Sequence, residues 1–185
     1  YVEHPTPAYS PSEVVEFYSD AGFTHGCSPD HIIFDCDSSN PPAESQPEDV
    51  LFRYEITLKN AQEFLRLVKD AGWPFEPLVA VQGWSPQSMA SAAKQLEEMG
   101  YRYLAIGGLV PLKVDQIHEV LKALRAILKP ETNIHLLGFA KAENIHEFTG
   151  YGITSFDSTS PLIRAFKDAK CNYYMETTTS KLDYY

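Results

Sequence analysis

The chain has 185 residues and a formal net charge of −10 at pH 7, with 44% hydrophobic and 22% charged residues. This balance is ordinary for a soluble globular domain with a substantial core, and the negative charge argues against a surface built mainly to grip phosphates. No apolar stretch approaches the roughly 20 residues that a membrane helix needs, and the chain opens with no secretory signal. The cysteines Cys27, Cys36 and Cys171 fit reduced thiols better than a disulfide framework or a zinc knuckle. We therefore expect a cytoplasmic protein with no membrane contact.

The first part of the chain predicts two helices, one strand and a long loop. Ser10 or Ser12 is placed to cap a helix that runs to about Ala21. An apolar run over 31–35 predicts the first strand. Residues 36–50 are rich in Pro, Ser, Asp and Glu and predict a loop, either a lid over a site or a solvated insertion. Thr57 is then expected to cap a helix that ends at Gly72.

Strands and helices alternate regularly in the remainder of the chain. We predict strands near 77–82, 103–107, 134–138 and 154–157, helices over 85–100, 114–128 and 161–168, and a short helix around 145–148. Residues 171–185 form a polar tail that we expect to be poorly ordered. The domain is accordingly expected over 1–170. The alternation predicts an α/β fold with a parallel sheet, which is either open or part of a larger barrel.

Each predicted strand ends in a carboxylate, an amide or glycine, and in a β/α barrel these ends face the active site. Asp157 could be a nucleophile toward an anomeric carbon, or it could cap the next helix. Asp35 could be a second carboxylate or could organise the following loop. Gln82 suits the edge of a purine-like base, because an amide both donates and accepts, although it could equally bond local backbone. Gly107-Gly108 lets backbone approach a flat ligand, and we expect His135 to be a satisfied core residue rather than a metal ligand.

Taken in order, these segments resemble the tRNA-guanine transglycosylase family over roughly residues 26–166. The match lies in Phe34-Asp35, Val81-Gln82-Gly83, Ala105-Ile106-Gly107-Gly108-Leu109, Leu137-Gly138 and Phe156-Asp157. The resemblance implies that Asp157 is the nucleophile and that Asp35, Gln82 and Gly108 bind the base. Gly107 and Gly138 complete the base-binding set that we predict.

Three longer stretches are similar to the DNA-modifying branch of that family, whose members exchange guanine in DNA for a 7-deazaguanine precursor. They are residues 82–86, 107–113 and 155–161. Ser28-Pro29-Asp30-His31 also looks like that branch, so Asp30 competes with Asp35 for the base-binding role. Two features depart from the family. Ser158-Thr159-Ser160-Pro161 stands where a Pro-Thr-Arg stretch is usual, and the cysteine-rich zinc site of the tRNA enzymes has no counterpart here.

The resemblance also implies that this chain holds the last five strand–helix units of a (β/α)8 TIM barrel. A further catalytic aspartate of the family would then lie upstream of Tyr1. On that interpretation the chain alone is inactive and associates through its exposed sheet edges, with partner proteins or with further copies of itself. No cofactor is expected in this chain. Zinc is left to the complete protein, because no ligand motif is present here.

The predicted function is base exchange in nucleic acid, with DNA favoured over tRNA as the substrate. A 7-deazaguanine replaces guanine through a covalent aspartyl-glycosyl intermediate, after the target base has been extruded. Three alternatives stay open. They are a queuine or preQ-type tRNA-guanine transglycosylase, a different barrel enzyme such as a phosphate-binding lyase or isomerase that uses the glycines as anion sites, and a non-catalytic nucleic-acid-binding barrel module.

Overall fold

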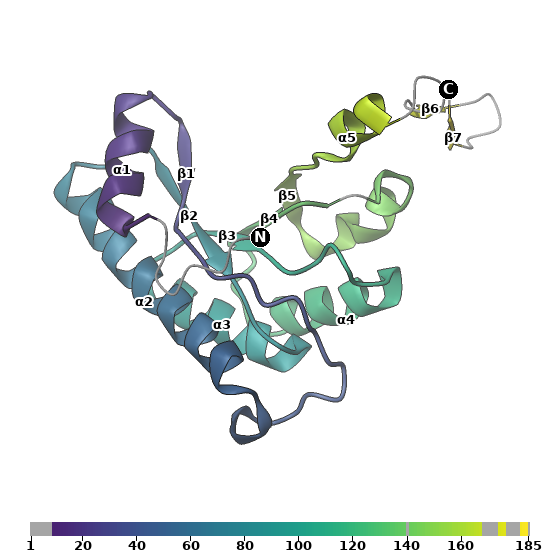
Figure 1. The fold of residues 1–185 in the computed structure, drawn as a ribbon, viewed down its shortest axis with the longest axis horizontal. Coiled ribbons are helices and arrows are strands. Elements are labelled where there is room, and N and C mark those ends of the chain that lie inside the picture. The colour runs from purple at the N-terminus through teal and green to yellow at the C-terminus, as the bar shows by residue number, and fades with distance from the viewer. Residues whose placement is uncertain (1–8, 140, 168–173, 177–181, 185) are drawn as a thin grey trace.

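A five-stranded parallel sheet, in the order β1-β2-β3-β4-β5, forms the centre of the molecule (Figure 1). The computed structural model describes residues 9–139, 141–167, 174–176 and 182–184. The strands are β1 His25–Cys27, β2 Glu76–Val81, β3 Tyr103–Ile106, β4 Asn133–Leu136 and β5 Ile153–Phe156. The α-helices are α1 Pro11–Asp20, α2 Glu48–Asp70, α3 Pro86–Met99, α4 Val114–Arg125 and α5 Ser160–Lys167, with 3-10 helices η1 Ala43–Ser45 and η2 Ala142–Tyr151. These five parallel strands, which alternate with helices, confirm the predicted α/β fold and suit part of a TIM barrel.

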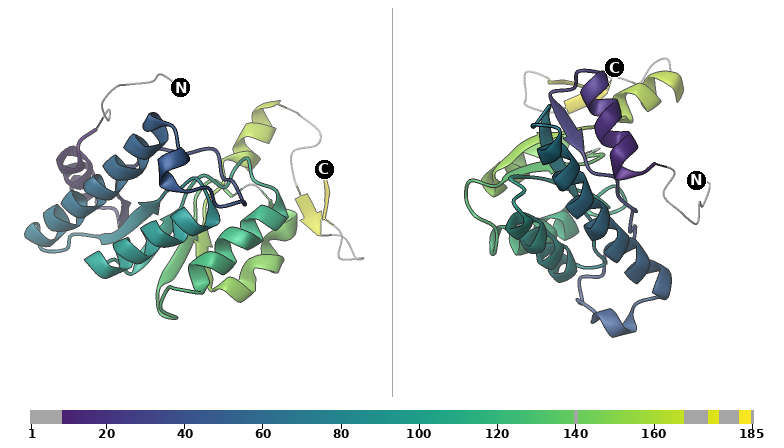
Figure 2. Two further views of the ribbon diagram at one scale, coloured as in Figure 1. Left: turned by 90° about the horizontal axis from the view of Figure 1, so that it is seen from below. Right: turned by 90° about the vertical axis from the view of Figure 1, so that its left-hand side faces the viewer.

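The core lies between the sheet and the helices α2, α3 and α4, which cover one face of the sheet (Figure 2). Side chains alternate between the two faces of a strand. The helix-facing set, fully buried, is Val79, Val81, Leu104, Ile106, Ile134 and Leu136. The residues between them on the strands face the other, concave side, so this alternation decides which side chains can reach a site inside the sheet.

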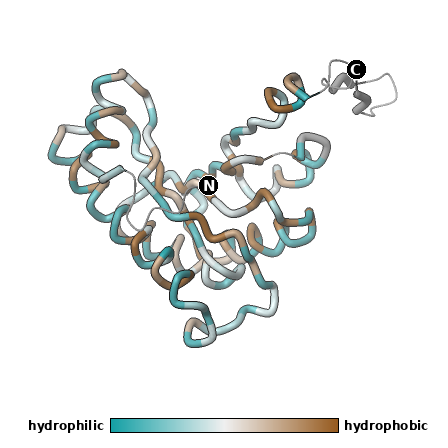
Figure 3. The backbone as a smooth tube through the Cα atoms, in the orientation of Figure 1, coloured by the Kyte–Doolittle hydropathy of each residue, from teal (hydrophilic) through white to brown (hydrophobic). Residues whose placement is uncertain are grey.

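The first strand lies earlier in the chain than the sequence predicts. It is β1 over His25–Cys27 and not the apolar run over 31–35, which carries no strand pairing. β1 pairs with β2 through Gly26 opposite Pro77, and a Cβ at Gly26 would meet the Phe75 ring at 2.6 Å. The apolar run instead crosses the ends of β2 and β3 as an extended segment, and it is the hydrophobic stretch of tube at the centre of Figure 3. It is apolar because it covers the sheet, not because it belongs to it.

The predicted helix cap at Thr57 is also wrong. α2 begins at Glu48, nine residues earlier, and has Glu48 and Asp49 in its first turn, where carboxylates favour the helix dipole. Thr57 lies buried within the helix, and its hydroxyl oxygen accepts a 2.9 Å hydrogen bond from the His31 backbone N–H. The loop is therefore shorter than predicted, because the helix takes over its last residues.

The polar tail contains more structure than expected. β6 Tyr174–Glu176 and β7 Leu182–Tyr184 pair as a two-stranded antiparallel sheet. Residues 168–173, 177–181 and 185 lie outside the described residues, and with them Asp168 at the predicted end of the last helix and Cys171. The described parts of the tail thus form paired strands, while its poor order stays a prediction.

Candidate active site at the carboxyl ends of the strands

Gln82 follows β2 directly, and its side chain is held on both sides. Its Oε1 accepts a hydrogen bond of 3.2 Å from the Ile33 N–H, and its Nε2 donates one of 2.6 Å to Asp30 Oδ2. Only 2% of the residue is exposed. A buried amide with both ends bonded has one orientation, so Gln82 presents Asp30 to the site in a fixed geometry.

The glycines after β3 make room for this arrangement. A Cβ on Gly107 would lie 2.2 Å from Gln82 Nε2, and a Cβ on Gly108 would lie 2.8 Å from the Ile33 carbonyl oxygen. Gly108 also has a φ of +71°, a conformation that favours glycine. Both positions therefore serve the packing of Gln82 and of the covering segment at the carboxyl ends of β2 and β3.

Asp30 reaches Gln82 because the chain after β1 is fastened to β2. The Ser28 N–H donates to the Leu78 carbonyl at 3.0 Å, and the Ser28 hydroxyl oxygen accepts from the Ala80 N–H at 3.2 Å. Burial raises the pKa of the Asp30 carboxyl, while the hydrogen bond from Gln82 and the nearby His31 oppose that shift. A desolvated carboxylate of this kind is a frequent feature of functional sites.

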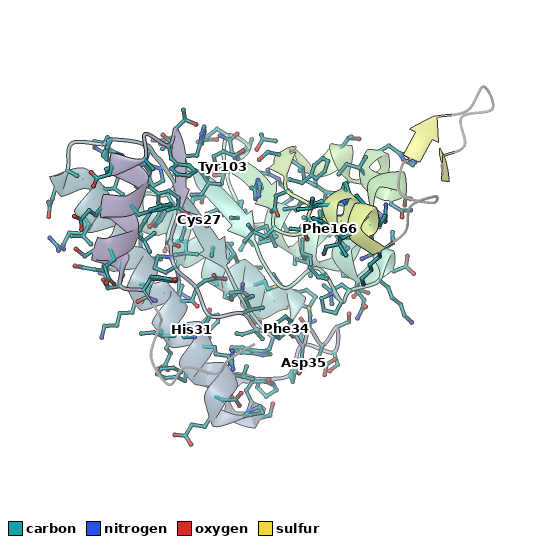
Figure 4. All side chains as sticks on the ribbon, turned by 45° about the horizontal axis from the view of Figure 1, so that its top comes forward. Cys27, His31, Phe34, Asp35, Tyr103 and Phe166 are labelled. Carbon is teal, nitrogen blue, oxygen red and sulfur yellow. The ribbon has the colours of Figure 1, made fainter. Side chains whose placement is uncertain are left out.

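Asp35 lies apart from this pair. The residue is exposed, and Figure 4 shows it beyond Phe34, away from Cys27 and Tyr103. Because 31–35 is not a strand, Asp35 does not stand at a strand end as the sequence predicts. Of the two competing carboxylates, the structure brings Asp30 to Gln82 and leaves Asp35 outside.

Asp157 follows β5, at the same end of the sheet, and its carboxylate turns toward β4. Oδ1 accepts hydrogen bonds from the Gly138 N–H at 2.9 Å and from His135 Nε2 at 3.1 Å. The Asp157 side chain is 51% exposed. Gly138 thus contributes its backbone N–H to Asp157. The first turn of α5 is served instead by Ser158, whose hydroxyl oxygen accepts from the Ser160 N–H at 3.3 Å.

His135 connects Asp157 to a row of hydroxyl groups. Its Nδ1 lies 2.6 Å from Ser155 Oγ, which lies 2.6 Å from the Tyr103 hydroxyl. The expectation that His135 is a satisfied core residue therefore missed its contact with Asp157. The strand register shows the relation. His135 is paired with Ser155, and Asp157 lies two residues after Ser155, so all three side chains face the same side of the sheet.

Asp30 and Asp157 both follow strands at the same end of the parallel sheet. The pKa of the Cys27 thiol is raised to about 12, first by its burial and then by the negative charges of these two carboxylates. Cys27 lies on β1 and Asp157 follows β5, so charges from the two edge strands of the sheet act on the same thiol. Within the described ranges, no group of three or more His, Cys, Asp or Glu side chains could hold a metal ion. No described helix is long and apolar enough to cross a membrane.

Five parallel strands that alternate with helices, with an amide and two carboxylates at their carboxyl ends, match part of a protein of the β/α-barrel class. The sequence model of the family described as queuine tRNA-ribosyltransferase matches residues 10–177. The chain belongs to this family, and the resemblance seen in its motifs is confirmed.

Named relatives come from both the DNA and the tRNA branches. The chain is 43% identical over 178 residues to a DNA-guanine transglycosylase of Salmonella montevideo. This match covers 94% of this chain and 42% of that protein. It is 32% identical over 79 residues to a queuine tRNA-ribosyltransferase of Chlamydia pneumoniae and 34% identical over 79 residues to that of Chlamydia trachomatis serovar L2. Each of these two matches covers 43% of this chain and 21% of the relative. The chain thus spans less than half the length of the relatives it matches.

Proposed function

We propose that the protein exchanges guanine in nucleic acid, with DNA as the favoured substrate, for a 7-deazaguanine through a covalent bond between Asp157 and the sugar C1′. The observation that carries this proposal is that the hydrogen-bonded pair Asp30–Gln82 and the half-exposed Asp157 lie at the same end of one parallel sheet. One group of side chains then serves base recognition and the other serves bond exchange.

Asp30 is suited to the Watson–Crick edge of guanine. That edge presents N–H donors beside a carbonyl oxygen, and a carboxylate accepts hydrogen bonds only. Gln82 donates to Oδ2 of Asp30, which turns the carboxylate without using all of its accepting capacity. A 7-deazaguanine differs from guanine at position 7, on the opposite edge of the base. A site that recognises the Watson–Crick edge therefore accepts both the leaving and the entering base.

Asp157 supplies the nucleophile in this scheme. One carboxylate oxygen attacks C1′, the C1′–N9 bond breaks, and its electron pair leaves with guanine, which takes up a proton. N9 of the entering base then attacks C1′, the ester bond to Asp157 breaks, and the entering base loses its N9 proton. Because one proton is taken up and one released, the exchange is balanced and needs no redox cofactor.

Water must be kept from the covalent intermediate, since its hydrolysis would leave the nucleic acid without a base. The segment over 31–34 is placed to help, because the Ile33 carbonyl lies against Gly108 at the strand ends. The loop before α2 is fastened as well. Its Asp37 N–H donates to the Trp84 carbonyl at 2.8 Å, and Trp84 Nε1 donates to the Pro41 carbonyl at 3.0 Å. These contacts support a fixed wall at this side of the site.

The preference for DNA rests on the relatives, because the match to the DNA-guanine transglycosylase extends over 94% of the chain and the tRNA matches over 43%. A cytoplasmic location is part of the proposal. It is supported by the free thiols of Cys27 and Cys36 in the described part of the chain.

The test is incorporation of a radiolabelled 7-deazaguanine by the complete protein, with duplex DNA and tRNA offered in parallel. We expect label in DNA and a loss of several orders of magnitude in Asp157→Asn, which keeps the shape of the side chain but not its nucleophilic carboxylate. Asp115→Asn, an exposed carboxylate on α4, is the matched control and should behave like wild type. Label in tRNA alone would overturn the DNA assignment, and undiminished incorporation by Asp157→Asn would overturn the mechanism.

A further inference from the structure

We infer that His135, oriented by Ser155 and Tyr103, is a positioning residue that holds Asp157 with one carboxylate oxygen bonded and the other turned to the substrate. This inference rests on the proposed function and deepens it. The inference is based on a continuous row of hydrogen bonds that runs from Tyr103 through Ser155 and His135 to Asp157. We call this row the β3–β5 relay.

The relay stands where barrels normally place apolar side chains. The inside of a β/α barrel is usually filled by layers of bulky branched residues. In this sheet, three adjacent strands instead place a phenol, an imidazole and a hydroxyl on the concave side, directly behind Asp157. Polar groups at low exposure are costly unless each has a partner. The His135 side chain is 15% exposed, and both of its ring nitrogens are bonded.

The direction of the relay follows from its carboxylate end. An ionised carboxylate only accepts hydrogen bonds, so His135 Nε2 must carry the proton in the 3.1 Å contact with Asp157. In a neutral imidazole, Nδ1 is then an acceptor, and the Ser155 hydroxyl must donate to it. The Ser155 oxygen is left to accept from the Tyr103 hydroxyl. One tautomer of His135 therefore satisfies every contact in the row.

This arrangement decides which oxygen of Asp157 attacks. The Gly138 N–H and His135 Nε2–H both bond Oδ1. Among the residues that the structure describes, Oδ2 accepts no hydrogen bond, and the Asp157 side chain as a whole is 51% exposed. A neutral imidazole at this position would orient the carboxylate without cancelling its charge. Fixing a nucleophile in its attacking geometry lowers the barrier to reaction, and a misplacement of about 1 Å can cost roughly 100-fold in rate.

A purely structural role would also join β3, β4 and β5, so the experiment must separate positioning from stability. In the complete protein we would compare Ser155→Ala, Tyr103→Phe and His135→Gln, the last of which keeps an N–H near Nε2. The matched control is a direct histidine–tyrosine contact outside the relay, of 2.9 Å between His118 Nδ1 on α4 and the Tyr151 hydroxyl of η2. It is removed by His118→Gln and Tyr151→Phe.

The kinetic readout is the single-turnover rate of the covalent step, measured beside KM and the melting temperature. We expect Ser155→Ala to lower the rate about 10- to 100-fold, because a misplacement of the nucleophile by about 1 Å can cost roughly 100-fold, with KM changed less than about twofold. His135→Gln should retain more activity than His135→Leu, and the control variants should keep the wild-type rate. A Ser155→Ala variant with the wild-type rate, or one whose loss is explained by a lower melting temperature, would overturn the inference.

A second readout does not depend on activity. ¹⁵N NMR of labelled histidine should show His135 as the Nε2–H tautomer in the wild type, because the Asp157 carboxylate accepts from Nε2. A wild-type His135 in the Nδ1–H form would overturn the positioning role even if base exchange occurs. The Nε2–H form in a protein that forms no adduct with DNA or tRNA would instead overturn the proposed function and, with it, the catalytic purpose of the relay.

Discussion

Gln82 Nε2 and Asp30 Oδ2 lie 2.6 Å apart, although 52 residues separate them in the chain. The amide belongs to the end of a central strand and the carboxylate to the segment after an edge strand, so the contact joins two sides of the site. Burial raises the pKa of Asp30, which means that folding with this carboxylate charged is unfavourable. A buried charged carboxylate is a strong hydrogen-bond acceptor that is already oriented before a ligand binds, and this preorganisation strengthens binding.

Asp30→Asn should therefore separate stability from binding. The folded-state pKa of Asp30 lies above its unfolded value. The charged carboxylate therefore lowers the free energy of unfolding at neutral pH. This loss of stability diminishes as the pH falls through the folded-state pKa and disappears below the unfolded-state pKa, because the carboxyl is then protonated in both states. Removing the charge should leave the free energy of unfolding at pH 7 unchanged or higher. Affinity for guanine should fall about 10- to 100-fold, the range for one good base contact. Urea denaturation and calorimetric titration with guanine measure the two effects.

Asp35→Asn is the matched control for that experiment. Asp35 is exposed and lies outside the cluster, so both measurements should give wild-type values. The opposite pattern, in which Asp35→Asn loses guanine affinity and Asp30→Asn keeps it, would contradict the assignment of the base site.

The same carboxyl predicts how guanine binding depends on pH. Because burial raises the pKa of Asp30, protonation begins at a higher pH than for an ordinary aspartate, and a protonated carboxyl loses accepting capacity. Guanine affinity of the wild type should decline as the pH is lowered into this window, and Asp30→Asn should show a flatter profile. Equal slopes in the two proteins would show that another group controls the decline.

Gly107→Ala tests the packing beneath the base site. Its Cβ would lie 2.2 Å from Gln82 Nε2, so the amide must move and release Asp30. We expect a loss of about 1–3 kcal/mol in the free energy of unfolding, as for other overpacking substitutions, together with weaker guanine binding. Gly150→Ala in η2, with no atom within 4 Å of the added Cβ, should be neutral in both respects. An equally stable Gly107→Ala variant would show that Gln82 is not fixed as described.

Arg125 tests the hydrogen bonds that hold β4 and β5, the strand that leads to Asp157, against α4. From the end of α4, its guanidinium donates to the Thr132 carbonyl at 2.9 Å, to the Gly152 carbonyl at 3.0 Å and to the Tyr151 carbonyl, which together fix the starts of β4 and β5. Arg125→Ala leaves these acceptors without their donor and should lower the free energy of unfolding by about 1–3 kcal/mol. Lysine has one compact donor group and should rescue only part of this loss. Lys122→Ala, exposed on the same helix, is the control for thermal denaturation.

The strands β2 to β5 could be predicted because strands of a parallel sheet covered by helices are apolar and end at turn residues. For the same reason, Gln82 and Asp157 could be placed at one edge of the sheet from their positions alone. β1 could not, since His25-Gly26-Cys27 has no apolar run and is fixed by contacts distant in sequence, between Gly26 and the Phe75 ring.

The error at β1 carried over into the site. The run that resembles a strand buries Ile33, which is 4% exposed, but leaves Phe34 49% exposed, as a covering segment does. The choice between Asp30 and Asp35 therefore required the three-dimensional structure, which shows Asp30 bonded to Gln82 and Asp35 exposed. His135 was underestimated for a related reason. A histidine inside a strand is typical of a core residue. Only the strand register shows that His135 lies beside Ser155 and Asp157.

The central claim, that Asp157 forms a bond to the sugar, is tested most directly by trapping that bond. The complete protein would be mixed with guanine-containing DNA, quenched in denaturant without an acceptor base, digested and mapped by mass spectrometry. We predict a nucleotide adduct on the peptide that contains Asp157, its absence in Asp157→Asn, and its release when a 7-deazaguanine is added before the quench. An adduct on a different residue, or base exchange that proceeds normally in Asp157→Asn, would contradict the account.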